Sequence, residues 1–330
     1  MSLLMPRATP LVSVTICCYN SEEYIAETVR SVLAQTWDDF EIVMVNDGST
    51  DLTEEIIKSF SDPRIQYYFQ TNAGVGATRN RAVDLSRGKY VAFLDHDDLW
   101  EPSKLEKQIP LLETRPEVAL VYSDCYFIDP HGDRFATYFA YQGVEPCRGR
   151  ALSALVKHGC FMQLPSVVVR KDALIEVGKF DPRYNIVEDY DTWMKIAAAH
   201  EVDYVREPLC SYRDHPANTS KTQQERGYQE LLNLVTEWSR RRDLSPEALT
   251  ELDRKYAEYA VTYLYWLMRR RRPASACARG LEFTATEFMR LFAIRSPDWR
   301  PAGSWTRASH ALRVIRSEIT KRWLTPGRCA

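Results

Sequence analysis

The stretch "YVAFLDHDDLW" at residues 90–100 places three carboxylates directly after a short hydrophobic run. Its first five residues are typical of a buried strand, and Asp95, Asp97 and Asp98 follow at once. Carboxylates this close repel and raise one another's pKa, so the cluster needs either water or a cation. A Mg²⁺ or Mn²⁺ site fits, because these ions prefer oxygen ligands. A solvated acidic turn before the helix that Pro102 opens is the structural alternative.

The segments on the N-terminal side of this stretch alternate between strand and helix patterns. Short apolar or β-branched runs occur at residues 11–18, 40–46 and 64–70, and helical spacing of apolar residues separates them. This alternation predicts an α/β fold with a mostly parallel sheet flanked by helices on both faces. Ligands of such sheets bind at the carboxyl ends of strands, where Asp47 and Asp95 fall.

The pattern is less regular after Trp100. A long strand is predicted at residues 118–128, a strand or hairpin arm at 135–143, and a helix at 188–200. From residue 223 onward the sequence predicts helices.

Composition places the chain among globular proteins with a sizeable core. Of its 330 residues 45% are hydrophobic, and the formal net charge is -2. Residues 261–330 contain 14 Lys or Arg and 4 Asp or Glu, so the C-terminal part is basic and the rest is acidic. A basic terminal segment indicates an anionic partner.

Targeting and redox features favour a cytoplasmic protein. The eight cysteines form no C-x-x-C pair, which argues against zinc and thioredoxin-like sites. Residues 1–9 lack the shape of a signal peptide and are predicted to be disordered or tag-derived. No run reaches the roughly 18 apolar residues of a spanning helix.

Three further segments carry candidate functional residues, each with a structural alternative. "TNAGVGATRN" places Arg79 in a helix that follows a glycine pair, which either cradles phosphate or only shapes a turn. "EDYDTW" puts Asp189 at a helix start, where carboxylates also act as caps. "YRDHPANTS" puts Arg213 and His215 on a predicted loop, and a lone loop histidine is usually no ligand.

Taken in order, these segments resemble the family 2 glycosyltransferases, which have the GT-A fold. The matching pieces are "VSVTICCYNSEEYI", "VNDGSTD", "NAGVGATRN", "FLDHDDLW", "VEDYDTW" and "YRDH", spread over about residues 10–220. The sequence departs from the family at Cys17 and Cys18, where proline and a small residue are usual, and at Ala82, where glycine is frequent.

The resemblance implies a role for each matching residue. Tyr19, Asp47 and Arg79 would bind the nucleoside of the donor, with Asp47 accepting from the base. In the D-x-D motif, Asp95 would face the ribose. Asp97 would bind Mn²⁺ or Mg²⁺, with Asp98 supporting it.

Two more roles follow from the same resemblance. His215 would complete the metal or pyrophosphate site, and Asp189 would be the general base. A base opposite a metal-bound nucleoside diphosphate leaving group implies a single displacement with inversion.

The resemblance therefore implies an inverting glycosyltransferase that uses a nucleotide-diphosphate sugar, with UDP-sugar favoured. The acceptor would be lipid-linked or an oligosaccharide, and the setting bacterial surface polysaccharide or glycolipid assembly in the cell envelope. Residues 10–222 would form the GT-A catalytic domain and residues 223–330 a helical, basic region.

Other functions stay open at this level. A haloacid-dehalogenase-like phosphatase also carries a D-x-D at a strand end, and a nucleotidyltransferase or a nucleotide-sugar-binding protein would share the fold. No nucleic-acid-binding motif accompanies the basic segment, so nucleic acid is not an expected partner. An amphipathic pattern at residues 306–323 gives two alternatives, a helix packed on the catalytic domain or peripheral contact with an anionic membrane on its inner face.

Overall fold

A computed structural model describes residues 9–271 of the chain. They divide into two compact units, one on each side of the boundary between Thr222 and Gln223. We describe the two units separately. The segments 1–8 and 272–330 lie outside the described residues, and with them the predicted N-terminal tail and the amphipathic pattern at 306–323.

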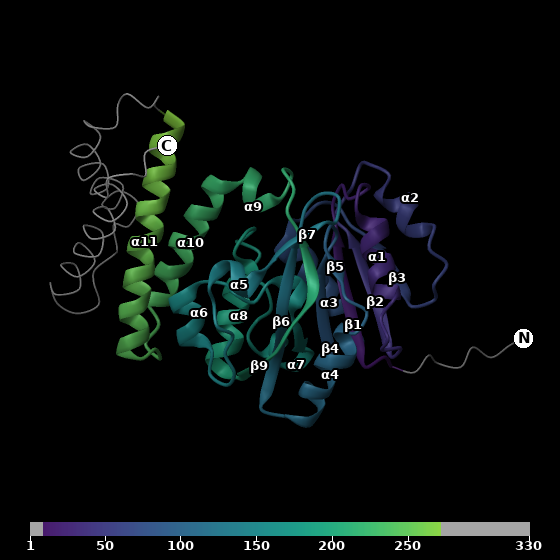
Figure 1. Ribbon diagram of the computed structural model, residues 1–330, viewed down its shortest axis with the longest axis horizontal. Coiled ribbons are helices and arrows are strands. Elements are labelled where there is room, and N and C mark those ends of the chain that lie inside the picture. The colour runs from purple at the N-terminus through teal and green to yellow at the C-terminus, as the bar shows by residue number, and fades with distance from the viewer. Residues whose placement is uncertain (1–8, 272–330) are drawn as a thin grey trace, which may run out of the picture. The chain divides into compact units, whose positions relative to one another are not determined.

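Four parallel strands form one half of the central sheet in the N-terminal unit (Figure 1). They are β1 (Val12–Cys18), β2 (Phe40–Asn46), β3 (Ile65–Phe69) and β4 (Tyr90–Asp95), and they pair in the order β3-β2-β1-β4. Helices α1 (Ile25–Leu33), α2 (Thr53–Lys58) and α3 (Val75–Leu85) connect them in turn. Parallel neighbouring strands need such crossover helices. The alternation of strands and helices predicted from the sequence is therefore confirmed, and with it the α/β fold.

The sheet continues beyond β4 with strands of both directions. The added strands are β5 (Leu99–Trp100), β6 (Val118–Ile128), β7 (Arg134–Thr137), β8 (Val168–Arg170) and β9 (Glu201–Arg213). β8 runs antiparallel between β4 and β6, while β9 runs parallel to β6 and carries β5 on its other side. The sheet is thus parallel where the βα repeats were predicted and mixed beyond them.

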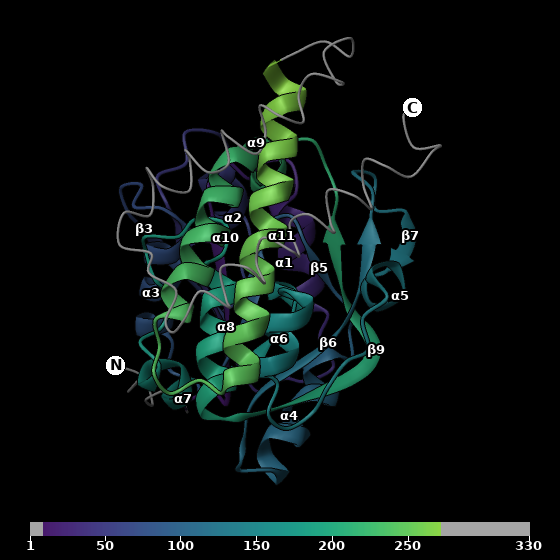
Figure 2. The same ribbon diagram turned by 90° about the vertical axis from the view of Figure 1, so that its left-hand side faces the viewer.

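The remaining helices of this unit follow β5 along the chain. They are α4 (Lys104–Thr114), α5 (Tyr138–Gln142), α6 (Leu152–His158), a short 3-10 turn at Leu164–Ser166, α7 (Lys171–Glu176), α8 (Glu188–Ala199) and α9 (Thr219–Thr222). Figure 2 shows α5 beside β7, along the edge of the curled part of the sheet.

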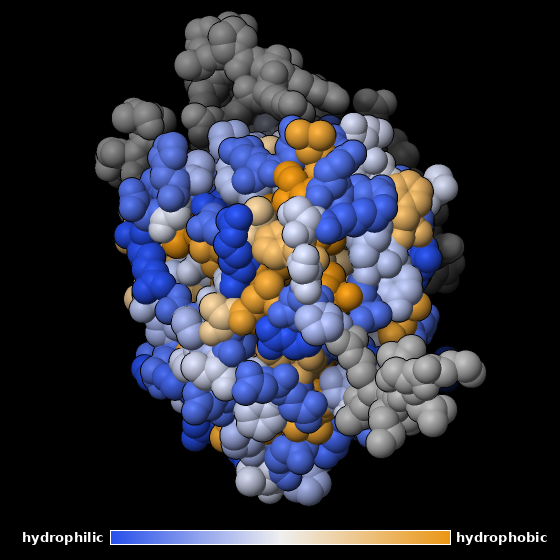
Figure 3. All heavy atoms as spheres, turned by 90° about the vertical axis from the view of Figure 1, so that its right-hand side faces the viewer, coloured by the Kyte–Doolittle hydropathy of each residue, from blue (hydrophilic) through white to orange (hydrophobic). Residues whose placement is uncertain are grey.

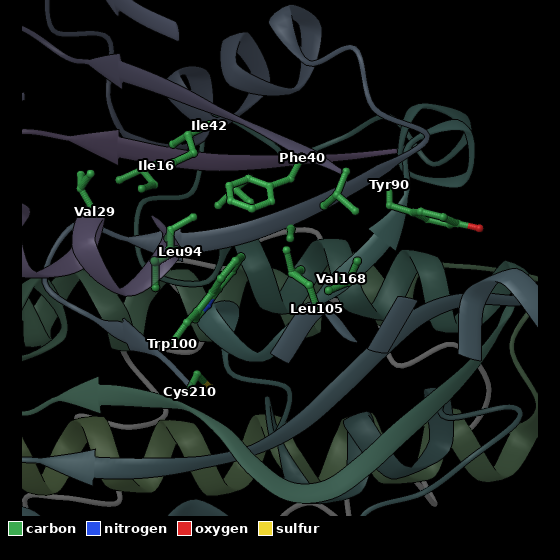
Figure 4. Packing of buried hydrophobic residues seen from close by; sticks show 14 of the residues in the cluster. Ile16, Val29, Phe40, Ile42, Tyr90, Leu94, Trp100, Leu105, Val168 and Cys210 are labelled. Carbon is green, nitrogen blue, oxygen red and sulfur yellow. The ribbon is translucent and has the colours of Figure 1, made fainter. Parts of the chain in front are cut away.

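The main core lies on the face of the sheet covered by α1 and α4. Alternate residues of β1 and β2, such as Ile16 and Ile42, pack there with Val29, Leu105 and Trp100 (Figure 4). Both faces are buried, so the strands read as nearly continuous apolar runs rather than alternating ones.

The opposite face of the sheet is covered by α3 and α8. Val43 and Val45 of β2 pack against Ala82 of α3. Phe93 of β4 lies 5.7 Å from Trp193 of α8, measured between ring centroids. Side chains alternate along a strand, so Asp95 projects to the same face as Phe93. This parity directs the first carboxylate of the acidic cluster toward α3 and α8.

Strand β3 ends the sheet on one side. Figure 3 shows the face that carries β3 and α2, where polar side chains dominate and apolar ones form a narrow band. The last residue of β3, Phe69, is 52% exposed and is one of the apolar side chains at this edge.

Two elements differ from the sequence-based prediction. The segment 135–143 was expected to be a strand or hairpin arm, but only Arg134–Thr137 is a strand and α5 follows. Gly143, with a φ of 63°, ends α5 in the left-handed conformation that glycine tolerates. The long strand β9 was not predicted, so Arg213 ends a strand and only His215 lies on the following loop.

The C-terminal unit is helical as far as the structure describes it. It contains α10 (Gln224–Ser239) and α11 (Pro246–Arg271), which pack against each other. The rings of Tyr228 and Tyr263 stack with centroids 5.6 Å apart. Within residues 9–271 no helix has the length and apolar character needed to cross a membrane.

Candidate active site

Polar residues follow β1, β2 and β4 at one edge of the sheet. Cys17 of β1 pairs with Asp95 of β4, and Cys18 pairs with Asn46 of β2. The next residue of β2's chain, Asp47, donates its backbone N–H to the carbonyl of Cys18 at 2.8 Å. The carboxyl ends of three strands therefore meet where the sequence predicted a ligand site.

Asp95 is held by an arginine. Its Oδ1 accepts from Arg79 Nη2 at 2.7 Å, and the same guanidinium binds Glu188 through Nη1. Burial by itself lowers the pKa of Arg79, but Asp95 and Glu188 raise it above its usual value. Arg79 is a permanent buried cation that connects the end of β4 to the first turn of α8.

Asp97 contacts a histidine that lies 118 positions later in the chain. His215 Nε2 lies 2.9 Å from Asp97 Oδ2, and both side chains are largely buried. Burial would raise the pKa of Asp97, but the charge of His96 and the hydrogen bond with His215 lower it below its usual value. The two residues predicted to bind a metal ion are thus brought together.

Asp98 is held by the backbone at the end of β9. Its Oδ1 accepts from the N–H of Arg213 at 2.9 Å, and the Arg213 side chain donates from Nε to the carbonyl of Asp97 at 2.8 Å. Arg213 is only 1% exposed, and its guanidinium also binds Glu27 and covers the ring of Tyr24. The acidic cluster therefore stays together through Arg79, His215 and Arg213.

Asp47 organises the start of α3. It accepts from Gln70 Nε2 at 2.6 Å, from the N–H of Ala73 at 2.8 Å and from the N–H of Gly74 at 3.0 Å. The backbone N–H groups of Ala73 and Gly74, which were considered as phosphate donors from the sequence, therefore bind Asp47 instead. A carboxylate has about four acceptor positions, and these three contacts occupy all but one of them at Asp47.

Glycine is required at two positions of this region. Gly74 has a φ of 87°, which lets the chain present its N–H to Asp47. A Cβ at Gly76 would lie 3.2 Å from the carbonyl of Asp181, so glycine allows α3 to approach the loop before α8. The glycine pair serves turn geometry and packing.

Tyr19 and Cys17 border the same edge. Tyr19 is 49% exposed, which leaves its ring accessible to a ligand. Cys17 lies next to Asp95 in the sheet, and burial raises the pKa of its thiol to about 12. Cys17 is therefore a neutral thiol in the place where proline is usual in the resembling family.

Asp189 lies in the first turn of α8, half-buried. Burial and the charge of Glu188 raise its pKa to about 7, and Arg79 opposes that rise. Its Oδ1 accepts from the N–H of Tyr190 at 2.6 Å. A carboxylate with a pKa near neutrality accepts a proton more readily than an ordinary one.

The residues fit a divalent cation that has few protein ligands. Among the described residues no group of three or more His, Cys, Asp or Glu side chains is arranged to hold a metal ion. Asp97 and His215 form a pair of oxygen and nitrogen donors, which leaves coordination positions for phosphate oxygens.

Sequence reasoning missed Glu188 and the roles of Arg213. From the sequence, Glu188 was interpreted only as an acidic residue at the start of a helix. Its partner Arg79 lies 109 positions earlier in the chain, so the ion pair could not be seen in a local pattern. Arg213 was noted only as a loop cation. The signal for both was the same, a charged residue inside a segment that has to be buried.

A comparison with protein families covers most of the residues described above. The family model described as Glycosyl transferase family 2 matches residues 13–177, half of the chain. The chain belongs to glycosyl transferase family 2. The matched range contains Asp47, Arg79, Asp95 and Asp97 and ends before Asp189 and His215.

Two curated relatives extend the sequence match. The uncharacterized glycosyltransferase RT0329 of Rickettsia typhi is 34% identical over 222 residues, which cover 65% of this chain and 67% of that protein. The proposed teichuronic acid biosynthesis glycosyltransferase TuaG of Bacillus subtilis is 44% identical over 114 residues, 34% of this chain and 45% of TuaG.

Solved structures share the fold at low identity. TarS 1–349 from S. aureus in complex with UDP has a TM-score of 0.62 at 19% identity, covering 96% of this chain and 93% of that one. The mannosyltransferase PcManGT from Pyrobaculum calidifontis in complex with GDP-Man and Mn²⁺ has a TM-score of 0.57 at 18% identity, covering 97% and 89%. This glycosyltransferase therefore has the GT-A fold expected from its sequence.

Proposed function

We propose that the protein is an inverting glycosyltransferase that moves a sugar from a nucleotide-diphosphate sugar to a hydroxyl acceptor. The observation that carries the proposal is the contact of Arg79 with both Asp95 and Glu188. It ties the D-x-D end of β4 to the helix turn that contains Asp189. Donor-binding groups and a candidate base are thereby held at one edge of the sheet.

Tyr19, Asp47, Arg79 and Asp95 bind the donor in this proposal. The exposed ring of Tyr19 stacks on the nucleobase, and the remaining acceptor position of Asp47 binds a base N–H. Asp95 accepts from a ribose hydroxyl, and Arg79 holds its carboxylate in place through their ion pair. We favour a UDP-sugar as donor, which agrees with the UDP bound to TarS.

Asp97 and His215 hold Mn²⁺ or Mg²⁺ in this proposal. When bound, the cation offsets the charge that develops on the diphosphate leaving group. The pairing of Asp97 with His215 supports this role, because it places a carboxylate and an imidazole at one point of the acidic turn. PcManGT was solved with Mn²⁺, which supports the same class of metal.

Asp189 takes the proton of the acceptor hydroxyl. The hydroxyl then attacks the anomeric carbon from the side opposite the diphosphate, and the sugar is transferred with inversion. The raised pKa of Asp189, about 7, supports this role because a stronger base is formed. Glu188 contributes by its negative charge.

The biological setting is also a proposal. We place the protein in bacterial surface polysaccharide or glycolipid assembly, with a lipid-linked or oligosaccharide acceptor, and with the cytoplasm or the inner face of the membrane as its location. The match to TuaG, whose name places it in teichuronic acid biosynthesis, supports this setting.

A donor screen tests the proposal. UDP-, GDP- and dTDP-sugars are each incubated with the protein and Mn²⁺, and released nucleoside diphosphate is measured. A glycosyltransferase releases nucleoside diphosphate from the sugar donor. Release is slow when water accepts the sugar and faster when an acceptor is present. A nucleotidyltransferase would instead release pyrophosphate when given nucleoside triphosphate and sugar phosphate, and a phosphatase would release inorganic phosphate. Binding of a donor without turnover under all conditions would reduce the protein to a nucleotide-sugar-binding role.

A further inference from the structure

Four residues join the end of β9 to the acidic turn in a closed ring of contacts. Arg213 donates from Nε to the carbonyl of Asp97 at 2.8 Å, and its own carbonyl accepts from Asn218 Nδ2 at 3.1 Å. Asn218 Oδ1 accepts from the N–H of His215 at 2.6 Å, and His215 Nε2 lies 2.9 Å from Asp97 Oδ2. We call Asp97, Arg213, Asn218 and His215 the metal-pair ring. Asn218 is the member that has no role in the proposed mechanism.

The Asn218 side chain closes this ring in one orientation only. A backbone N–H donates and a carbonyl accepts, so Oδ1 has to face His215 and Nδ2 has to face Arg213. All three residues are buried, so loss of the amide would leave a buried N–H and a buried carbonyl without this partner. The backbone N–H of Asn218 also donates to the carbonyl of His215 at 3.2 Å. Asn218 therefore fixes the backbone of His215 relative to that of Arg213.

Tyr24, the residue before α1, packs against two members of the ring. Its ring centroid lies 5.1 Å from that of the His215 imidazole, and Cζ of Arg213 lies 4.7 Å from the Tyr24 centroid. A histidine side chain changes rotamer where the space beside it is open. Tyr24 fills part of that space, which favours the rotamer that directs Nε2 at Asp97.

Holding the imidazole and the carboxylate in place lowers the cost of binding a metal ion. Side chains that a cation has to order lose rotamer freedom when it binds, and that loss weakens the affinity. Residues that support a ligating histidine therefore affect metal binding without touching the metal, typically by about 10–100-fold in affinity. The metal-pair ring and Tyr24 provide this kind of support.

We propose that Asn218 and Tyr24 are positioning residues of the metal site, which set the affinity for Mn²⁺ or Mg²⁺ without contacting the cation. Asn218 acts through the backbone of His215, and Tyr24 acts through the imidazole. The inference rests on the proposed function, because it assigns supporting partners to the proposed ligands Asp97 and His215.

Mn²⁺ binding to the full-length protein tests the two roles. Binding is followed by EPR as the loss of signal from free Mn²⁺, which needs neither nucleotide nor turnover. We expect Asn218→Ala and Asn218→Leu to bind Mn²⁺ at least about tenfold more weakly than the wild type. These variants differ in volume but lack the same two hydrogen bonds, so their losses should be similar. Tyr24→Leu should also weaken binding, whereas Tyr24→Phe keeps the ring and should bind as the wild type does.

Asn80 provides a matched control. Its Nδ2 donates to the carbonyl of Phe180 at 2.8 Å, and its Oδ1 accepts from the N–H of Phe180 at 2.9 Å. Asn80→Ala and Asn80→Leu therefore remove the same two kinds of hydrogen bond outside the metal-pair ring. They should lower the Tm as the Asn218 variants do, but keep the wild-type affinity for Mn²⁺.

Three results would overturn the inference. They are wild-type Mn²⁺ affinity in the Asn218 variants and Tyr24→Leu, an equal loss of affinity in the Asn80 variants, or no Mn²⁺ binding by the wild type. Release of nucleoside diphosphate from sugar donors is measured in parallel on the wild type. Release together with any of these results would reject the positioning roles and leave the glycosyltransferase proposal standing. Weaker Mn²⁺ binding by the Asn218 variants, without release from any donor, would keep the positioning roles and reject the glycosyltransferase proposal.

Discussion

At the residue scale, Asp189 and Glu188 stand next to each other with different surroundings. Glu188 binds the buried Arg79, whereas Asp189 is half-buried and its pKa is raised to about 7. Adjacent carboxylates in different surroundings are a common feature of acid–base sites. In the proposed mechanism Glu188 is the structural member, through its buried ion pair with Arg79, and Asp189 exchanges the proton.

Replacing the proposed base gives the first prediction. Asp189→Asn should lower turnover at least about a hundredfold, because the amide cannot take the acceptor proton, while donor affinity changes little. Nucleotide release with acceptor gives turnover, and calorimetric titration of the donor gives affinity. Asp172→Asn is a matched control, since Asp172 also accepts from the next residue's N–H at a helix start but is exposed. Near-normal turnover of Asp189→Asn would reject the assignment.

The pH dependence of the rate gives the second prediction. Asp189 acts only when ionised, so the rate should fall as pH is lowered through about 7. Glu188→Gln removes the neighbouring negative charge that raises the pKa of Asp189, and the acidic limb of the pH–rate profile should move to lower pH. Steady-state rates between pH 5 and 9 measure the limb. An unmoved limb, with Arg79 still paired to Asp95, would show that another group sets it.

At the scale of elements, β9 does more than complete the sheet. Its last residue, Arg213, is buried and binds the carbonyls of Asp97 and Pro130 as well as Glu27. The strand thus delivers both the backbone that fixes Asp98 and, two residues later, His215. The acidic turn and β9 form one unit, although more than a hundred positions separate Asp97 from Arg213 along the chain.

Substitution of this arginine gives the third prediction. Arg213→Lys keeps the charge, but its donors sit on one nitrogen and cannot reach the three partners that Nε, Nη1 and Nη2 of Arg213 bind. The free energy of unfolding should therefore drop by about 1–3 kcal/mol. The apparent affinity for Mn²⁺ should also fall, because the carbonyl of Asp97 loses its donor. Urea unfolding and metal titration of activity check the two effects. Arg206→Lys, at an exposed ion pair with Glu145, should change neither measurement appreciably.

At the scale of the whole molecule, the sequence predicts best what is local. The three βα repeats and the fourth strand were predicted because short apolar runs and helical periodicity alternate from residue 11 to residue 95. β9 was missed because its segment contains Pro208 and several charges, and its pairing with β6 shifts register near Asp124. Its extended form depends on strands β6 and β5, which no window of its own sequence reveals.

The candidate site follows the same division. Asp47 and Asp95 could be predicted because each directly follows a run that reads as a strand, and Asp97 because it stands two residues after Asp95 in the same acidic cluster. The partnership of Arg79 with Glu188, and that of Asp98 with Arg213, join distant segments and needed the folded chain. The roles of all these residues remain proposals that the experiments decide.

Binding of nucleotide and metal to the whole protein gives the last prediction. If Asp97 and His215 hold a cation that also binds diphosphate, then UDP and Mn²⁺ should stabilise the fold together more than either does alone. Ligand at about a hundred times its Kd adds about 2.7 kcal/mol. For a domain of this size such a gain corresponds to a rise in Tm of roughly 5–10 °C.

Thermal unfolding is measured with UDP, Mn²⁺, both, and both plus excess chelator. Chelator should remove the joint effect and abolish nucleotide release, while Asp97→Ala should respond to UDP equally with and without Mn²⁺. Asp133→Ala, an exposed carboxylate on the turn before β7, is the control and should behave as wild type. If UDP raises the wild-type Tm equally in Mn²⁺ and in chelator, the metal role of Asp97 and His215 is wrong.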